Sequence, residues 1–178
     1  ELPTGWEWPE SDRNWLGTHW AIDIGIASLS RKLATHLQAP AVLAGFSRLL
    51  IDPNRELTSE TLFRTHCDGV EIGLNRGLSE AEKQARIDRC YTPFHDAVSA
   101  MLLATPRANV LSMHSFTPVY EGGAPRWMEV GVLFDRDEAL AVRVAAAIEA
   151  TGLRVALNEP YSGRGGLMHS ATTHAATH

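Results

Sequence analysis

The sequence has few cysteines, no long hydrophobic run and no excess of positive charge, and each absence excludes a class of protein. Its two cysteines stand in no CxxC or zinc-ribbon spacing and give no disulfide framework, which is typical of a reducing compartment. No apolar run approaches the ~20 residues that a membrane-spanning helix needs. The net charge of -5 argues against broad neutralisation of nucleic-acid phosphates. We therefore expect a cytoplasmic protein that binds neither nucleic acid nor a membrane.

The length of the chain favours one domain. Its 178 residues are enough for a substantial core but too few for two domains, so we expect a single domain over residues 1–178. The first residues, ELPTGWEWPE, lack the basic and then apolar layout of a signal peptide. The chain starts in a loop-like segment and stops at HAATH, with no element completed at either end. We therefore expect segments of the protein to lie outside it.

Three segments have the pattern of helices. Apolar residues recur at helical spacing over residues 19–37. Residues 79–82 fit a capping box that opens a long helix, which Pro93 should kink. Residues 137–150 are rich in alanine, and Gly152 ends that pattern.

Short apolar runs between these helices predict strands. The runs at 41–46 and 48–51 are β-like or extended, and those at 109–113, 128–134 and 153–157 are typical of strands. Strands that alternate with helices predict an α/β fold with a mixed, mostly parallel sheet flanked by helices.

Polar residues follow three of these apolar runs. The clusters are DPNR at 52–55, HSFTP at 114–118 and NEPYSG at 158–163. If the runs are neighbouring strands, their polar ends meet at one edge of the sheet, where open α/β folds bind ligands. The sequence therefore predicts one site built from three loops.

Several residues in or near these clusters have two explanations. His114 is either a hydrogen-bonded surface group or a metal ligand at a strand end. His19 and Asp23 are four residues apart, so they would share one helix face, either as ligands of one metal or as a helix-start pair. Arg48 and Arg55 form either surface salt bridges or a forked site for a carboxylate.

Six motifs together resemble the N-formylglutamate amidohydrolase family. They are HWAIDIG at 19–25, SRLLIDPNR at 47–55, Asn75 with LSEAE at 78–82, PFH at 93–95, LSMHSFTP at 111–118 and NEPYSG at 158–163, in the order of that family. The family is similar to the zinc-dependent exopeptidases, of the phosphorylase/hydrolase-like architecture. The DPNR cluster is also similar to the Asp-x-Asn-Arg of aspartoacylase-type deacylases, in which the arginine holds a substrate carboxylate.

The resemblance implies roles for individual residues. Zinc, or another divalent metal, would be held by His114, His19 and Asp23. The substrate would be bound by Arg48, Asn54, Arg55, Ser115, Asn158 and Tyr161. Glu159 is a candidate general base, although the resemblance places the main base in a strand beyond His178. The remaining histidines on predicted helices, His36, His95, His169 and His174, are expected to be structural.

The implied reaction is hydrolysis of the amide of N-formyl-L-glutamate, or of a similar N-acyl amino acid, by metal-activated water. Two alternatives stay open: a deacylase or peptidase for another N-acyl amino acid or small peptide, and a non-catalytic binding module on the same scaffold. The oligomeric state is not predicted. For the HSFTP cluster, we expect the strand to end at or just before His114, with Ser115 outside β geometry and facing the site.

Overall fold

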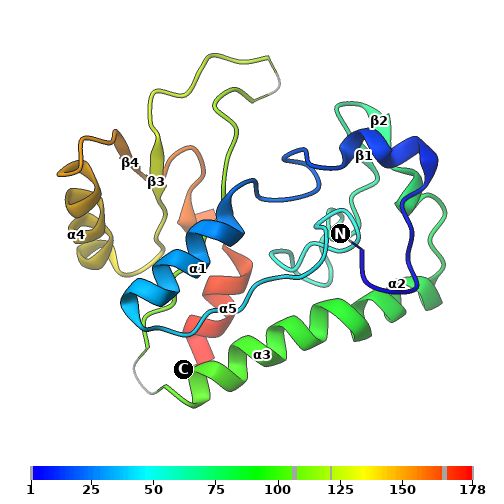
Figure 1. The fold of residues 1–178 in the computed structure, drawn as a ribbon, viewed down its shortest axis with the longest axis horizontal. Coiled ribbons are helices and arrows are strands. Elements are labelled where there is room, and N and C mark those ends of the chain that lie inside the picture. Colours follow the sequence, from blue (N-terminus) through cyan, green and yellow to red (C-terminus); the bar gives the residue numbers. More distant parts are fainter. Residues whose placement is uncertain (1, 106–107, 121, 166–167, 178) are drawn as a thin grey trace.

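The structure is a computed structural model that describes residues 2–105, 108–120, 122–165 and 168–177. Its described part is a mixed α/β fold in which helices are joined by long irregular segments (Figure 1). The α-helices are α1 (Ile26–Leu37), α2 (Glu80–Arg86), α3 (Thr92–Leu103), α4 (Glu138–Glu149) and α5 (His169–Thr177). Short 3-10 helices are η1 (Glu10–Trp15), η2 (Gly73–Asn75) and η4 (Gly163–Gly165), and η3 (Ile87–Tyr91) is a π-helix. None of the described helices is both long and apolar enough to cross a membrane.

The longest element is a nearly continuous helix made of α2, η3 and α3, which runs along the base of the molecule in Figure 1. It begins at the predicted capping box, where the Ser79 hydroxyl accepts from the amide of Glu82 and the Glu82 carboxylate accepts from the amide of Ser79. Pro93 lies in the first turn of α3, directly after the π-helical turn. Because proline has no N–H to donate, the chain accommodates it with a wider turn and the helix continues.

Two small sheets are present in the described residues. β1 (His66–Cys67) pairs antiparallel with β2 (Val70–Glu71), and β3 (Val130–Val132) pairs parallel with β4 (Val155–Leu157). Helix α4 connects β3 to β4, so this βαβ unit confirms the helix and the two strands predicted between residues 128 and 157. The expected mostly parallel sheet is not seen among the described residues, which contain only these two-stranded pairs.

Other predicted elements are wrong. Residues 109–113 form no strand, and Leu111 is 61% exposed, so no sheet covers this run. Residues 41–51 are irregular, although Leu50 and Ile51 are both 0% exposed. The apolar run there reflects burial, which a turn can provide as well as a strand. The first helix begins at Ile26 rather than His19, because Gly25 precedes it with φ of 80°.

The hydrophobic core lies between η1 and the long helix. Its fully packed members are Trp15, Ala21, Leu49, Leu50, Ile51, Leu62, Cys67, Ile72, Leu74, Cys90 and Tyr91. Buried Arg86 crosses this core and donates to the carbonyls of Leu50 (2.9 Å) and Leu74 (2.7 Å) and to the Asn75 side chain. Asn75 in turn donates to the carbonyls of Leu49 (2.8 Å) and Arg64 (2.6 Å). These bonds satisfy buried carbonyls and fix the segment that leads into the DPNR cluster.

Candidate active site

The centre of the candidate site is a contact between His114 and Asp23. The Nδ1 atom of His114 lies 2.7 Å from Oδ2 of Asp23, although the two residues are far apart in the sequence. The other ring nitrogen of His114 lies 3.1 Å from the Ser112 hydroxyl. The His114 side chain is 47% exposed and that of Asp23 is 22% exposed, so the pair is accessible to a small molecule.

Arg48 links this pair to the DPNR cluster. Its Nη1 lies 3.5 Å from Asp23 Oδ1, and its Nη2 lies 2.9 Å from Asp52 Oδ2. Burial opposes the charge on Arg48, but Asp52 and then Asp23 outweigh it, so the pKa of Arg48 is raised, with a further contribution from Tyr161. Since both arms of its guanidinium meet carboxylates, Arg48 holds Asp23 in place.

The DPNR cluster forms a tight turn. Asp52 Oδ1 accepts from the amide of Asn54 (3.0 Å), and the Asp52 carbonyl accepts from the amide of Arg55 (3.1 Å). The Asn54 side-chain oxygen accepts from the amide of Ser170 at the start of α5 (3.1 Å). Arg55 donates through Nε to the Thr61 hydroxyl (3.1 Å) and through Nη1 to a backbone carbonyl (3.2 Å). The Asn54 side-chain oxygen and two Arg55 nitrogens thus have contacts within the fold.

Aromatic and histidine side chains on η3 and α3 contact the backbone of this turn, and histidines on α5 contact them. His95 Nε2 lies 3.1 Å from the Pro53 carbonyl, and its Nδ1 lies 2.9 Å from His174 Nε2. Tyr91 donates to the Arg55 carbonyl (2.9 Å) and contacts His169. Burial and then His174 lower the pKa of His95 to about 4, and burial also lowers the pKa of His169. These neutral rings position the turn, as expected for structural histidines.

The NEPYSG cluster follows β4 and is shaped mainly by Asn158. This residue has φ of 53°, and its side-chain oxygen accepts from the amides of Phe134 and Gly163, both at 3.0 Å. A Cβ atom on Gly131 would collide with the Glu159 carbonyl, so only glycine fits beside this loop. The exposed Glu159 carboxylate accepts from the Trp127 indole at 3.2 Å.

Arg126 joins the NEPYSG cluster to the HSFTP cluster, and sequence reasoning did not single it out. Its guanidinium lies over the rings of Phe116 (5.1 Å), Tyr161 (5.3 Å) and Tyr120 (5.9 Å), and it donates to the Tyr161 hydroxyl at 3.2 Å. Arg126 stands just before an apolar strand and is part of none of the motifs. The signal that could have found it is the group of aromatic residues in the two clusters, which suits a cation.

The three polar clusters are therefore linked through Arg48, the His114–Asp23 contact and Arg126. The NEPYSG cluster follows a strand, β4, as predicted, whereas the other two clusters follow irregular segments. The predicted strand before His114 is absent, so the alternation argument does not apply to Ser115, which is half-buried and forms no hydrogen bond with the described residues. His19 and Asp23 do not share a helix face, because residues 18–25 form turns and bends.

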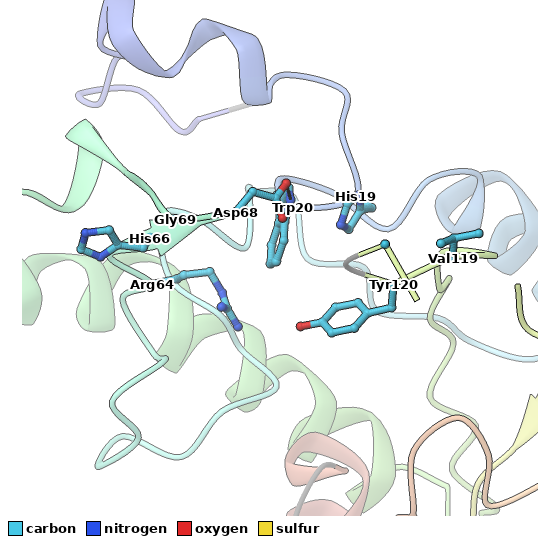
Figure 2. A pocket seen from close by; sticks show the side chains of 9 residues that line it. His19, Trp20, Arg64, His66, Asp68, Gly69, Val119 and Tyr120 are labelled. Carbon is cyan, nitrogen blue, oxygen red and sulfur yellow. Dashed lines mark hydrogen bonds between the residues drawn. The ribbon is translucent and has the colours of Figure 1, made fainter. Parts of the chain in front are cut away.

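His19 lies in an open pocket of about 780 Å³ beside the candidate site. The pocket is lined by His19, Trp20, Arg64, His66, Asp68, Gly69, Val119, Tyr120 and Gly122. Figure 2 shows the Arg64 guanidinium and the Tyr120 hydroxyl pointing toward each other from opposite sides, with the Trp20 ring between them. The His19 ring packs on that of Trp20, with centroids 4.8 Å apart.

The donor atoms of His114 and Asp23 fit a zinc ion chemically. Imidazole nitrogen and carboxylate oxygen are common zinc ligands, and here they already face each other at 2.7 Å. The Ser112 hydroxyl on the other ring nitrogen is the type of contact that orients a metal-binding histidine. No group of three His, Cys, Asp or Glu side chains suited to a metal occurs in the described part of the chain. The structure thus brings two predicted ligands together, and ligation by His19 stays a prediction.

Comparison with known proteins gives one family. The sequence matches the model of the N-formylglutamate amidohydrolase family over residues 9–178. The fold is similar to the crystal structure of a gene product from Agrobacterium tumefaciens, with a TM-score of 0.81 and 34% sequence identity, and the match covers 93% of this chain and 67% of that chain. No curated protein matches the sequence. With nearly all of its length matched, the chain belongs to the N-formylglutamate amidohydrolase family.

Proposed function

We propose that this protein hydrolyses the amide of N-formyl-L-glutamate, or of a closely similar N-acyl amino acid, to the free amino acid and the carboxylate of the acyl group. The proposal rests mainly on the contact between His114 and Asp23, which Arg48 supports. Each of these three residues lies in a different family motif. The reaction adds one water across the amide C–N bond. The site therefore has to bind the substrate, orient its carbonyl and move one proton to the leaving nitrogen.

His114 and Asp23 are the residues that would hold zinc or another divalent metal, with further ligation needed to complete the site. Such a metal polarises an amide carbonyl and lowers the pKa of a bound water toward ~7. Arg48 orients the Asp23 carboxylate, because it donates to Asp23 on one side and to buried Asp52 on the other. The Ser112 hydroxyl fixes the His114 ring through its second nitrogen.

The substrate is proposed to contact residues from all three polar clusters. Arg55 binds one substrate carboxylate. A guanidinium has five N–H donors, and in the described part of the chain two nitrogens of Arg55 are used in contacts with the fold. Asn54, Asn158 and Ser115 line the approach to that position. Tyr161, whose hydroxyl oxygen accepts from Arg126, donates its hydroxyl hydrogen to the substrate.

Glu159 is the candidate for proton transfer within the described loops. Its carboxylate is exposed and held by the Trp127 indole, so it is placed in the same loop as Tyr161 but is not neutralised by an ion pair with a described residue. A carboxylate in this position can take a proton from water and return it to the leaving amine. That the main general base lies outside residues 1–178, as the family resemblance implies, stays a prediction.

Metal content and product release test the proposal together. Protein purified without chelators should contain close to one zinc per chain by mass spectrometry of metals, and it should release formate from N-formyl-L-glutamate. We expect His114→Ala and Asp23→Asn each to lose most of the metal and of the activity. His36→Ala, a change at an exposed position of α1, is the matched control.

Three results would contradict this account. Full metal content in His114→Ala would remove His114 from the metal site. Hydrolysis of other N-acyl amino acids with no activity on N-formyl-L-glutamate would favour the deacylase alternative. Binding of these compounds without hydrolysis of any of them would favour a binding module.

A further inference from the structure

We propose that Arg64 and Tyr120 bind a free carboxylate of the substrate's amino-acid part in the pocket shown in Figure 2. This inference rests on the proposed function and adds a second anion-binding position to it. N-formyl-L-glutamate carries two free carboxylates, and Arg55 is proposed for one of them. The pocket supplies the cation for the other.

Arg64 differs from Arg48, which the motifs singled out, in the ion pairing of its charge. Arg48 already pairs with two carboxylates, at 3.5 Å and 2.9 Å. Arg64 forms no ion pair with any residue in the described ranges, and its guanidinium lies over the Trp20 ring, 5.3 Å from the centroid. A guanidinium that stacks on an indole keeps its in-plane N–H donors directed outward, where they can meet a carboxylate in a two-point contact.

The backbone of Arg64 is fixed by the core. Its carbonyl accepts from the Asn75 side chain at 2.6 Å, and Asn75 is only 4% exposed. The next carbonyl, that of Thr65, accepts from the amide of Ile72 at 2.7 Å. The Arg64 side chain therefore extends from a rigid base, and little ordering of the protein is needed when a ligand binds.

The rest of the pocket suits a small anion with an aliphatic stem. Its volume of about 780 Å³ is ordinary for a small-molecule site. Among the described lining residues, the carboxylate is that of Asp68, which accepts from the Trp20 indole at 3.1 Å. Besides Arg64 and Asp68, the titratable lining groups are His19, His66 and the Tyr120 phenol, which Figure 2 shows directed at Arg64.

The pocket and the His114–Asp23 pair are linked by two short stretches of chain. His19 lines the pocket and precedes Asp23 by four residues, and Tyr120 lines it six residues after His114. Since an extended chain spans at most ~3.6 Å per residue, the backbone of Asp23 lies within about 14 Å of that of His19. The pocket therefore lies on the same side of the fold as the proposed reacting centre, and the proposal requires the substrate to extend from one toward the other.

The test compares Arg64→Met and Tyr120→Phe with wild type on N-formyl-L-glutamate and on N-formyl-L-glutamine, which lacks the side-chain carboxylate. We expect Arg64→Met to raise KM for N-formyl-L-glutamate by a factor on the order of 10 to 100, with a smaller change in kcat, because a charge-assisted contact is lost. Tyr120→Phe removes one hydroxyl at a position that is 45% exposed, so it tests the same contact with a smaller change. Arg76→Met, which breaks an exposed pair with Glu71, is the control for lost charge.

Each outcome decides the proposal. A larger effect on the glutamate compound places its side-chain carboxylate at Arg64, and equal effects on both compounds place the α-carboxylate there. Unchanged KM values in Arg64→Met and Tyr120→Phe overturn the inference. If wild type hydrolyses neither compound, the proposed function fails, and titration calorimetry with L-glutamate then tests the pocket alone: Arg64→Met must weaken binding by a similar factor, while Arg76→Met must not.

Discussion

The residues of the candidate site come from two regions that are held in different ways. Residues 47–55 lie in a core where Leu50 and Ile51 are 0% exposed and where Arg86 and its partners satisfy the backbone. His114, in contrast, lies in the stretch 108–120, which has no helix or strand. The comparison indicates that the core fixes the first region and the polar side chains that follow it. The second region depends on a few side-chain contacts, among them the one between His114 and Asp23.

The largest effect is expected from Arg86→Met. This change removes the donors of three buried oxygen atoms, so it should lower the free energy of unfolding by about 4 kcal/mol. The same change at Arg143, exposed on α4, should cost less than about 0.5 kcal/mol. Urea denaturation followed by circular dichroism measures both. Similar losses in the two variants would show that the Arg86 network does not set the stability of the core.

Truncation of leucine sharpens the same contrast. Leu50→Ala creates a cavity in the core and should cost about 3 kcal/mol, whereas Leu111→Ala, at a position 61% exposed, should cost less than about 0.5 kcal/mol. The same denaturation measurement applies. A large loss from Leu111→Ala would show that the stretch around His114 is packed against something in solution, and the comparison between the two regions would no longer hold.

Arg55→Lys tests whether the first region binds an anion. Lysine keeps the positive charge but loses the fork, so KM for N-formyl-L-glutamate should rise by a factor that corresponds to about 2 kcal/mol, and more than KM for a neutral N-formyl amino acid. Steady-state kinetics of the metal-loaded protein measure the effect, with Arg31→Lys on exposed α1 as the control. Equal rises for both substrates would place the α-carboxylate at Arg55, and unchanged KM values would make Arg55 a structural residue.

The smallest effect is a dependence of stability on pH through His95. Its pKa is about 4 in the folded state, below the ordinary value of 6.5, so between these values the unfolded state binds a proton that the folded state does not. The free energy of unfolding should therefore fall as the pH falls through this window. Because the ring is only partly buried, we expect about 1 kcal/mol between pH 7 and pH 5.

His95→Gln isolates this contribution, because glutamine can hydrogen-bond but does not titrate. Urea denaturation at pH 7, 6 and 5 should show a shallower loss in this variant than in wild type. The exposed His36→Gln should keep the wild-type slope. A slope that is unchanged in His95→Gln would mean that another group causes the acid sensitivity.

Expectations from the sequence succeeded where contacts between residues close in sequence decide the element, and they failed where contacts between distant segments decide it. The capping box at Ser79 and the helix over residues 138–149 were predicted because hydrogen bonds within a few residues decide them. The predicted strands at 48–51 and 109–113 failed because an apolar run specifies burial, or only hydrophobicity, and a strand also needs a neighbour to pair with. Motif order, finally, identified the family although several of the motifs lie in irregular segments.

By itself the sequence determined which polar clusters would form the candidate site, because its motifs place charged and hydrogen-bonding residues directly after apolar runs. Only the tertiary structure decided how those residues are used. It joined Asp23 to His114 across the chain, paired Arg48 internally, and left Arg64 over Trp20 without an ion-pair partner among the described residues. The physical reason is that the availability of a charged side chain depends on which opposite charges lie within a few ångströms of it, and these come from segments far apart in the sequence.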